Sequence, residues 1–146
     1  KVVQNQLNSY FEDKKLLNET QSGFRQNHSC ESLLNLVVTQ WKTEVKNRNC
    51  VVAVFLDFKR AFETINREIM LEKLQKYGIK SIELKWFKRY LGNRTQKTRC
   101  GDEISKIKNI NIGASQGAVL GTLLFLIYVN DLEKVFKKSK VCMFAD

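Results

Sequence analysis

The sequence contains no proline among its 146 residues, only one histidine, and four cysteines that lie far apart. At an average proline usage of about 5%, roughly seven prolines would be expected. Lysine, asparagine and isoleucine are plentiful instead, which fits either an AT-rich genome or relaxed selection. With a single histidine and no C-x-x-C pair, the sequence gives no sign of a zinc site.

Long hydrophobic runs are also missing. The longest apolar stretch, 119–129, contains Gly121 and Thr122 and is too short to span a bilayer. The first residues lack the apolar core of a signal peptide, and we expect no membrane partner. Cys50 and Cys142 lie in apolar runs and are predicted to be buried free thiols. Free thiols suit a reducing compartment, so we expect the protein in the nucleus and cytoplasm.

Acidic residues are few compared with basic ones. The chain has 25 Lys and Arg against 15 Asp and Glu, a formal net charge of +10. Nine basic and three acidic residues fall between positions 80 and 108, so this span carries +6. The imbalance favours a polyanionic partner such as nucleic acid, whereas a solvated surface is the alternative for a lysine-rich stretch.

The patterning predicts one compact α+β unit, and 43% hydrophobic residues are enough to bury a core. Periodicity, caps and glycines predict helices over 1–19, 29–46, 61–77, 81–91 and 116–130. Apolar or alternating runs predict strands over 50–57, 95–100, 104–112 and 141–145, with a hairpin turn at Gly101-Asp102. We expect the helix over 29–46 to bury an apolar face, and the strand over 50–57 to be buried on both faces.

Two of these strands each carry an aspartate at the end of an apolar run, Asp57 and Asp146. Carboxylate oxygens are the ligands that Mg²⁺ prefers, and adjacent strand tips suit the paired ions of a phosphoryl-transfer site. For Asp57 the alternative is a helix N-cap for the segment that begins near Lys59. The presence of both aspartates shifts the balance towards metal binding.

A second candidate segment is rich in small residues, from Gly113 to Gly121. Small residues let the backbone approach a ligand closely, and the following helix N-terminus favours anionic groups. Gln116 lies at the turn, where its amide can contact a base or sugar. The alternative is a tight turn before a packed helix. Phe62, five residues after Asp57, can wall a sugar pocket, belong to a buried helix stripe, or do both.

Four sequence blocks occur in a characteristic order. They are QSGFR at 21–25, FLDFKRAFETIN at 55–66, ASQGAVLGTLLF at 114–125 followed by YVNDL at 128–132, and FAD at 144–146. Together they resemble the reverse transcriptases of non-LTR (LINE-type) retrotransposons, especially the jockey-like insect elements. The resemblance covers about residues 5–146.

The resemblance implies a partial right-hand polymerase, with a palm and part of the fingers, in which helices pack on an antiparallel sheet. Residues 1–50 would be fingers-side helices and 51–146 the palm core, with the thumb and upstream fingers missing. The implied activity is RNA-directed DNA polymerase, which joins dNTPs to a primer 3′-hydroxyl on an RNA template. Two Mg²⁺ ions would assist, with Mn²⁺ as a substitute.

The resemblance also implies roles for individual residues. Asp57 and Asp146 would be catalytic metal ligands, assisted by the backbone carbonyl of Phe58. Phe62 would be the steric gate against a 2′-hydroxyl, and the incoming nucleotide would contact Gln116 and Gly117. The template and primer backbones would contact six basic residues: Lys85, Lys88, Arg89, Arg94, Lys97 and Arg99.

The sequence departs from the family pattern at several positions. Ser115 and Thr122 stand where proline is usual, and Arg67 where histidine is common. Since the second aspartate of FADD does not follow, we expect the chain alone to be inactive. One alternative is a decayed or co-opted remnant that only binds nucleic acid. Another is a reverse transcriptase of the group II intron type, which the YVNDL ending disfavours.

Overall fold

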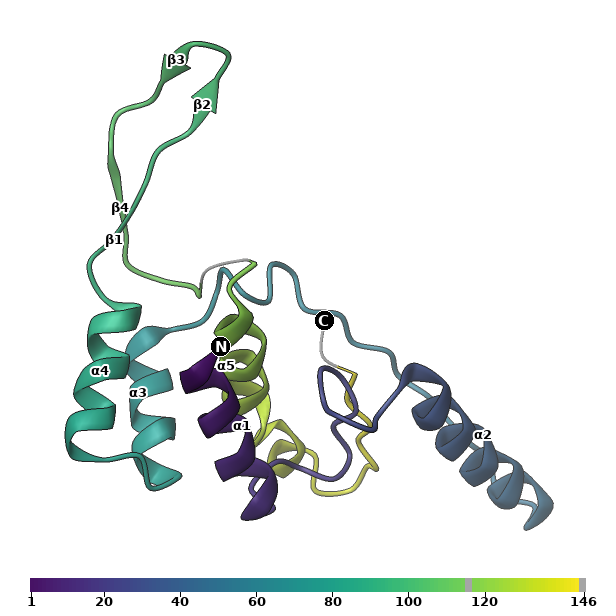
Figure 1. The fold of residues 1–146 in the computed structure, drawn as a ribbon. Coiled ribbons are helices and arrows are strands. Elements are labelled where there is room, and N and C mark those ends of the chain that lie inside the picture. Colours follow the sequence, from purple (N-terminus) through teal and green to yellow (C-terminus); the bar gives the residue numbers. More distant parts are fainter. Residues whose placement is uncertain (115–116, 145–146) are drawn as a thin grey trace.

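The computed structural model describes residues 1–114 and 117–144. Figure 1 shows its helices and strands in chain order. The helices are α1 (Val2–Asp13), α2 (Cys30–Lys46), α3 (Arg67–Lys76), α4 (Ser81–Leu91), α5 (Val119–Val129) and the 3₁₀ helix η1 (Leu132–Val135). The strands are β1 (Arg94–Gln96), β2 (Arg99–Cys100), β3 (Glu103–Ile104) and β4 (Lys108–Ile110).

Helix α5 is the centre of the hydrophobic core. Eight of its eleven residues are buried, as expected for a helix that is apolar on every side. It packs against α1 and α3, and α3 in turn packs against α4. The core side chains contributed by the other segments include Phe11, Leu17, Ile65, Met70, Leu74, Phe87 and Leu91. Helices α1, α3, α4 and α5, with the segments that connect them, therefore enclose one core.

Local cap signals place some helix ends correctly, but α1 ends at Asp13 rather than at residue 19, and α5 begins at Val119 rather than at residue 116. Ser29 caps α2 in a reciprocal capping box with Ser32. Helix α4 ends at Gly92, as predicted, and Gly78 follows the end of α3 with φ +92°. The predicted start of α3 near residue 61 is wrong, because the side chain of Asn66 accepts hydrogen bonds from the amides of the first turn and starts the helix there.

The expectation that α2 buries an apolar face is wrong. None of its residues is buried, and Leu34 and Val45 are 60% and 63% exposed. Figure 1 shows the helix extending away from the other four. The sequence pattern correctly predicted an amphipathic helix, but such a pattern cannot specify what covers the apolar face.

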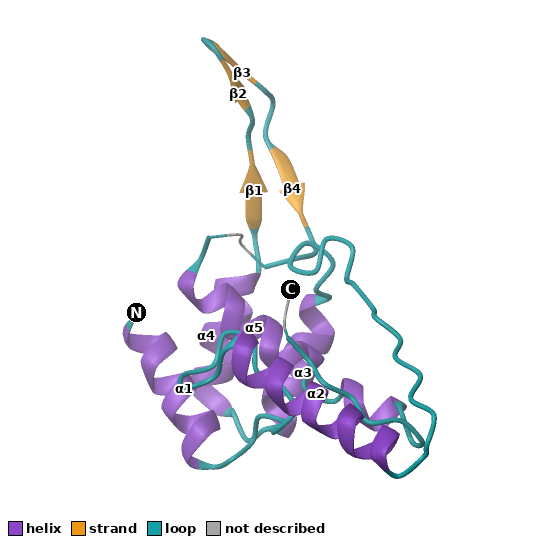
Figure 2. Cartoon of the chain, turned by 90° about the vertical axis from the view of Figure 1, so that its right-hand side faces the viewer, coloured by secondary structure: helices purple, strands orange, loops and turns teal. Residues whose placement is uncertain are grey.

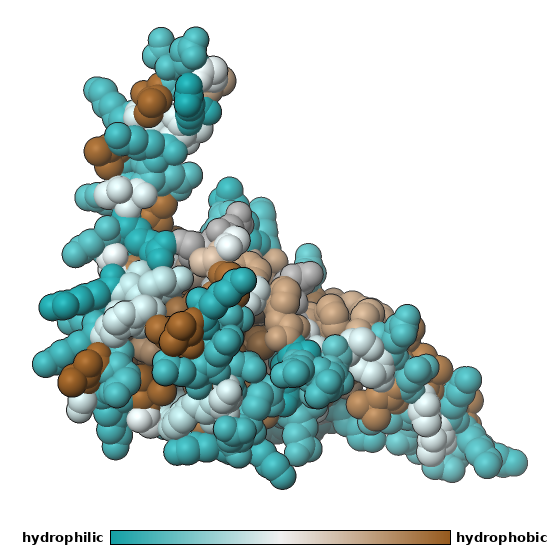
Figure 3. Space-filling model, in the orientation of Figure 1, coloured by the Kyte–Doolittle hydropathy of each residue, from teal (hydrophilic) through white to brown (hydrophobic). Residues whose placement is uncertain are grey.

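The predicted strand over 50–57 is also wrong. Val52, Val54 and Phe55 are 88%, 77% and 86% exposed, and the segment forms no strand. Figure 3 shows hydrophobic surface along this stretch. A strand needs a neighbour for its backbone hydrogen bonds, and no other part of the described chain pairs with it.

Three further expectations about the apolar runs are corrected. Cys50 and Cys142 are exposed free thiols rather than buried ones, because an apolar run does not bury every side chain within it: Met143, next to Cys142, is buried, but Cys142 is not. In place of a strand over 141–145, the described part of this segment forms an isolated parallel bridge between Gln21 and Met143. Residue 145 lies outside the described ranges.

The strands form a hairpin arm, defined here as residues 94–110. β1 pairs antiparallel with β4, and nearer the tip β2 pairs antiparallel with β3. The predicted turn is present, with Gly101 at φ +60°. Figures 1 and 2 show the arm projecting from the helices. The α+β class is therefore confirmed, but helices do not pack on this sheet, contrary to the prediction.

Within the described ranges, no helix has the length and apolar character needed to cross a membrane.

Candidate active site

Asp57 lies in the exposed, irregular segment that follows α2. Its carboxylate forms no hydrogen bond or ion pair with the described part of the chain. The alternative role as a helix cap near Lys59 is wrong, because the next helix begins only after Asn66. The carboxylate is therefore available to a ligand from solvent.

Of the other predicted metal and nucleotide ligands, Asp146 and Gln116 lie outside the described residues. Gly117 is exposed with φ +75°, a conformation that glycine adopts readily. Among residues 1–114 and 117–144, no three His, Cys, Asp or Glu side chains cluster as a metal site. The Asp57 carboxylate and the Phe58 carbonyl are oxygen donors of the kind that Mg²⁺ prefers.

Phe62 belongs to an aromatic cluster that joins three of the sequence blocks. Its ring centroid is 5.0 Å from that of Phe125 in α5 and 6.4 Å from that of Phe24. Phe58 also packs edge-on against Phe125, at 6.1 Å. Because Phe125 is only 2% exposed, the cluster anchors the candidate gate residue to the core.

Backbone hydrogen bonds hold the turn around Phe62 against the segment that follows the hairpin arm. The Ala114 amide donates to the Phe62 carbonyl at 2.9 Å, and the Gly113 amide donates to the Ile65 carbonyl at 2.8 Å. Gly113 has φ +83°, and a Cβ atom there would lie 2.8 Å from the Glu63 carbonyl oxygen. The two segments therefore meet at a point where only glycine fits without displacement.

Arg25, the last residue of the QSGFR block, holds the block to Glu12 of α1, a contact that the sequence analysis did not predict. Arg25 forms two hydrogen bonds with the Glu12 carboxylate, at 3.1 and 2.8 Å, and donates to the Asn18 carbonyl at 2.9 Å. The hydrogen bond from Arg25 holds the pKa of Glu12 below its usual value, although burial opposes the shift. Nothing in the spacing of the sequence pairs these two residues.

The YVNDL block has a structural role that the sequence analysis also missed. The buried Asn130 amide donates to the Leu16 carbonyl at 2.8 Å and to the Tyr77 hydroxyl at 2.7 Å, and its oxygen accepts from the Asn18 amide at 2.7 Å. It therefore links the end of α5 to the segments after α1 and α3.

The next residue in this block, Asp131, forms an ion pair with Lys73 of α3. Burial alone would raise the pKa of Asp131, but the hydrogen bond and charge of Lys73 outweigh burial, so the pKa is lowered. Both polar residues of the block thus tie α5 to its neighbours.

The six predicted nucleic-acid contacts form two groups. Lys85, Lys88 and Arg89 are exposed on one face of α4, because they are spaced at i, i+3 and i+4. Lys97 and Arg99 are exposed on the hairpin arm, where Arg99 also contacts Asp102 at 3.9 Å. The structure therefore places five of the six on exposed surface.

The sixth residue, Arg94, joins the two groups. Its guanidinium lies 4.9 Å from the Tyr90 ring, which stacks on Trp86 with centroids 5.2 Å apart and planes 8° apart. Exposed aromatic rings beside basic residues are typical of surfaces that bind nucleic-acid strands.

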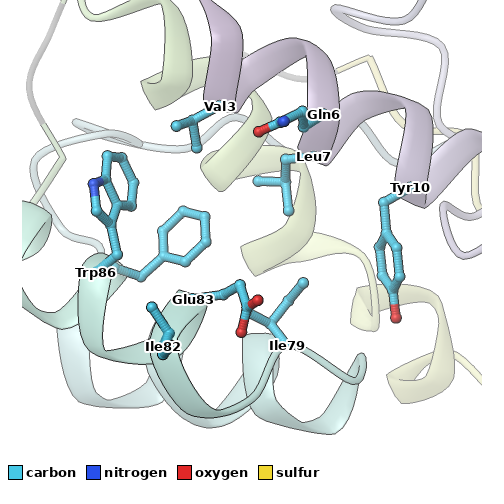
Figure 4. A pocket seen from close by; sticks show the side chains of 9 residues that line it. Val3, Gln6, Leu7, Tyr10, Ile79, Ile82, Glu83 and Trp86 are labelled. Atoms are coloured by element: carbon cyan, nitrogen blue, oxygen red, sulfur yellow. The ribbon is translucent and has the colours of Figure 1, made fainter.

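A groove of about 340 Å³ lies between α1 and α4, and Trp86 contributes to its lining as well as to the Trp86–Tyr90 stack. Figure 4 shows its lining, which is mainly apolar and includes Val3, Leu7, Ile82 and Trp86, with Glu83 at one side. None of the predicted site residues that the structure describes lines this groove.

Comparisons with known proteins agree with the resemblance to non-LTR retrotransposon proteins. Three relatives from Drosophila melanogaster cover 90–94% of the chain. The probable RNA-directed DNA polymerase from transposon X-element is 31% identical over 142 residues, and that from transposon BS is 27% identical over 138. The RNA-directed DNA polymerase from mobile element jockey is 28% identical over 132 residues.

The chain spans 14–16% of the length of these relatives. No solved structure gives a significant match. Residues 1–146 match, in full, the family described as reverse transcriptase (RNA-dependent DNA polymerase). The chain therefore belongs to the reverse transcriptase family.

Proposed function

We propose that this chain forms part of an RNA-directed DNA polymerase that joins dNTPs to a primer 3′-hydroxyl on an RNA template. The observation that carries the proposal is the family match over the whole chain. The aromatic cluster around Phe62 supports it, because it brings three separate sequence blocks together. In this proposal residues 1–50 belong to the fingers side and 51–146 to the palm core.

The chemistry requires positioning more than covalent participation by the protein. Asp57, Asp146 and the Phe58 carbonyl would hold two Mg²⁺ ions, or Mn²⁺ in their place. The ions would neutralise charge on the phosphates. The Phe62 ring would exclude a 2′-hydroxyl, and Gln116 and Gly117 would line the nucleotide.

The RNA template and DNA primer would bind along the basic face of α4 and the hairpin arm. This surface offers exposed cations and a stacked Trp86–Tyr90 pair, which suit phosphates and bases respectively. Contacts of this kind give affinity that depends on salt and little on sequence.

The test of catalysis replaces the matching segment of the X-element polymerase with this chain. A control chimera carries the X-element's own segment through the same junctions. The chimera with this chain should extend a DNA primer on RNA with Mg²⁺ and dNTPs. Asp57→Asn should abolish extension, whereas Asp13→Asn, at an exposed position in the last turn of α1, should not. A folded chimera that is inactive beside an active control would contradict the proposal.

A second candidate function, binding of nucleic acid without catalysis, is favoured by the exposed arm and α4 face, which do not require Asp57. The isolated chain should bind an RNA–DNA duplex with an affinity that falls steeply with salt. Replacing Lys97 and Arg99 with glutamine should reduce the log–log salt slope by about one for each phosphate that the variant no longer neutralises. Binding by the chain together with an inactive chimera would favour this second function.

A further inference from the structure

Arg67, the first residue of α3, binds three backbone carbonyls of one passing segment. Its Nη1 donates to the Ile110 carbonyl at 2.6 Å, its Nη2 to the Ile112 carbonyl at 3.1 Å, and its Nε to the Gly113 carbonyl at 3.1 Å. Ile110 is the last residue of β4. Arg67 therefore fixes the point where the hairpin arm returns to the helical core.

Only arginine among the side chains can make this set of contacts. Its planar guanidinium presents five donors in a fixed fork, whereas lysine carries one compact ammonium. Burial, followed by the positive charge of Arg94, lowers the pKa of Arg67. The Arg67 guanidinium is therefore partly buried near the positive charge of Arg94. Its hydrogen bonds to the three carbonyls compensate for the cost of burying the charge there.

The same segment is bonded to the turn that carries Phe62. The Gly113 and Ala114 amides donate to the Ile65 and Phe62 carbonyls, at 2.8 and 2.9 Å. Arg67 therefore binds carbonyl groups of segment 110–114, while two amide groups of the same segment donate to the turn that carries Phe62. In the sequence, the candidate nucleotide ligands Gln116 and Gly117 follow Ala114 within three positions.

We propose that Arg67 is a positioning residue for the nucleotide site, which fixes segment 110–114 against the turn at 62–65. Through this segment it sets the position of Phe62 and of Ala114, which precedes the candidate nucleotide ligands Gln116 and Gly117 in the sequence. The inference rests on the proposed polymerase function for its effect on nucleotides, but the coupling between the two segments stands on the hydrogen bonds alone.

The coupling is tested on the 146-residue chain by hydrogen exchange. Arg67→Met should speed exchange at the Gly113 and Ala114 amides about tenfold and leave the α5 amides unchanged. Arg67→Lys should give an intermediate effect, because the three donors of an ammonium lie on one nitrogen and lack the planar fork that matches these three carbonyls. The control Arg48→Met, at an exposed arginine after α2, should change neither set of amides.

Unchanged exchange at Gly113 and Ala114 in Arg67→Met would overturn the coupling. Faster exchange that is equal in α5 would also overturn it, since that result indicates general destabilisation. Neither outcome depends on polymerase activity.

The effect on nucleotides is tested in the X-element chimera with dNTPs and rNTPs. Because small displacements at a reacting site have large kinetic effects, Arg67→Met should lower the ratio of kcat/KM for dNTP to that for rNTP about tenfold. A purely structural role would lower both values equally and leave the ratio unchanged, which would refute positioning. An unmodified chimera that cannot extend a primer instead counts against the proposed function, and hydrogen exchange then decides the coupling.

Discussion

Replacement of Gly113 by alanine should be one of the most destabilising small changes in this chain. Gly113 combines φ +83° with a site in which an added Cβ would lie 2.8, 3.0 and 3.1 Å from backbone atoms of Glu63. All three are backbone atoms, so no flexible side chain can move aside. Either the Gly113 segment or the Glu63 turn must shift, and the hydrogen bond from the Gly113 amide to the Ile65 carbonyl would be strained.

The magnitude follows from two separate costs. A positive φ costs a residue with a Cβ roughly 1–2 kcal/mol, and overpacking a closed site adds roughly 1–3 kcal/mol. We expect Gly113→Ala to lower the free energy of unfolding by about 2–5 kcal/mol, a large part of the typical total of about 5–15 kcal/mol.

Gly101→Ala is the matched control. Gly101 has φ +60°, but an added Cβ would meet nothing within 4 Å. It therefore carries only the conformational cost of about 1–2 kcal/mol. The loss of unfolded-state entropy on changing glycine to alanine is common to both variants, so it cancels in their difference.

The assay is urea unfolding of both variants and the unmodified chain, followed by circular dichroism of the helices. The slope of the unfolding free energy against urea concentration should be the same for all three proteins, so that a shift of the midpoint reports a change in stability. Equal destabilisation by Gly113→Ala and Gly101→Ala would refute the close contact with Glu63. A selective loss for Gly113→Ala would support it.

Three further predictions concern the polar network, acid stability and the thiols. Asn130→Ala leaves three partners unsatisfied and should cost about 2–4 kcal/mol in urea unfolding, and a loss below about 1 kcal/mol would contradict the network. The pKa values of Glu12 and Asp131 are lowered in the folded state, so their stabilisation is complete above their ordinary values of 4.5 and 3.8 and is lost as the pH falls through the folded values. The free energy of unfolding should therefore be lower at about pH 3 than at about pH 6, and Glu12→Gln should make this difference smaller. A thiol reagent should label all four cysteines of the native chain without denaturant, and protection of any one would contradict their exposure: Cys30, Cys50, Cys100 and Cys142.

Features with local causes could be predicted from the sequence. The Ser29 cap, the Gly92 stop and the Gly101 turn each depend on residues within a few positions, and the structure confirms all three. The buried character of α5 also follows from its own composition. In each case the physical signal and its consequence lie in the same short stretch of chain.

Features that depend on distant neighbours could not be predicted. The run before Asp57 has the composition of a buried strand, yet burial requires a partner that its own residues cannot specify. Likewise, Asn130 belongs to a recognised block, but its bonds reach Leu16 and Asn18 across more than a hundred positions. Only the folded chain shows that this residue organises three segments.

The candidate site likewise has features that the sequence predicts and features that depend on distant neighbours. The sequence resemblance gave Asp57 and Phe62 as candidate site residues, but it predicted neither the contact of Phe62 with Phe24 nor the three carbonyls bound by Arg67. Those contacts arise where segments far apart in sequence meet, and no periodic pattern encodes such a meeting.

The exposed run before Asp57 has a consequence for the behaviour of the chain in solution. Residues 51–56 carry no charge and no proline, and their composition is that of segments that stack into intermolecular cross-β assemblies. Asp57, with Lys59 and Arg60 just beyond it, borders this run with charges that oppose such stacking. We therefore expect the Asp57 carboxylate, proposed as a metal ligand, also to oppose stacking of this run between chains.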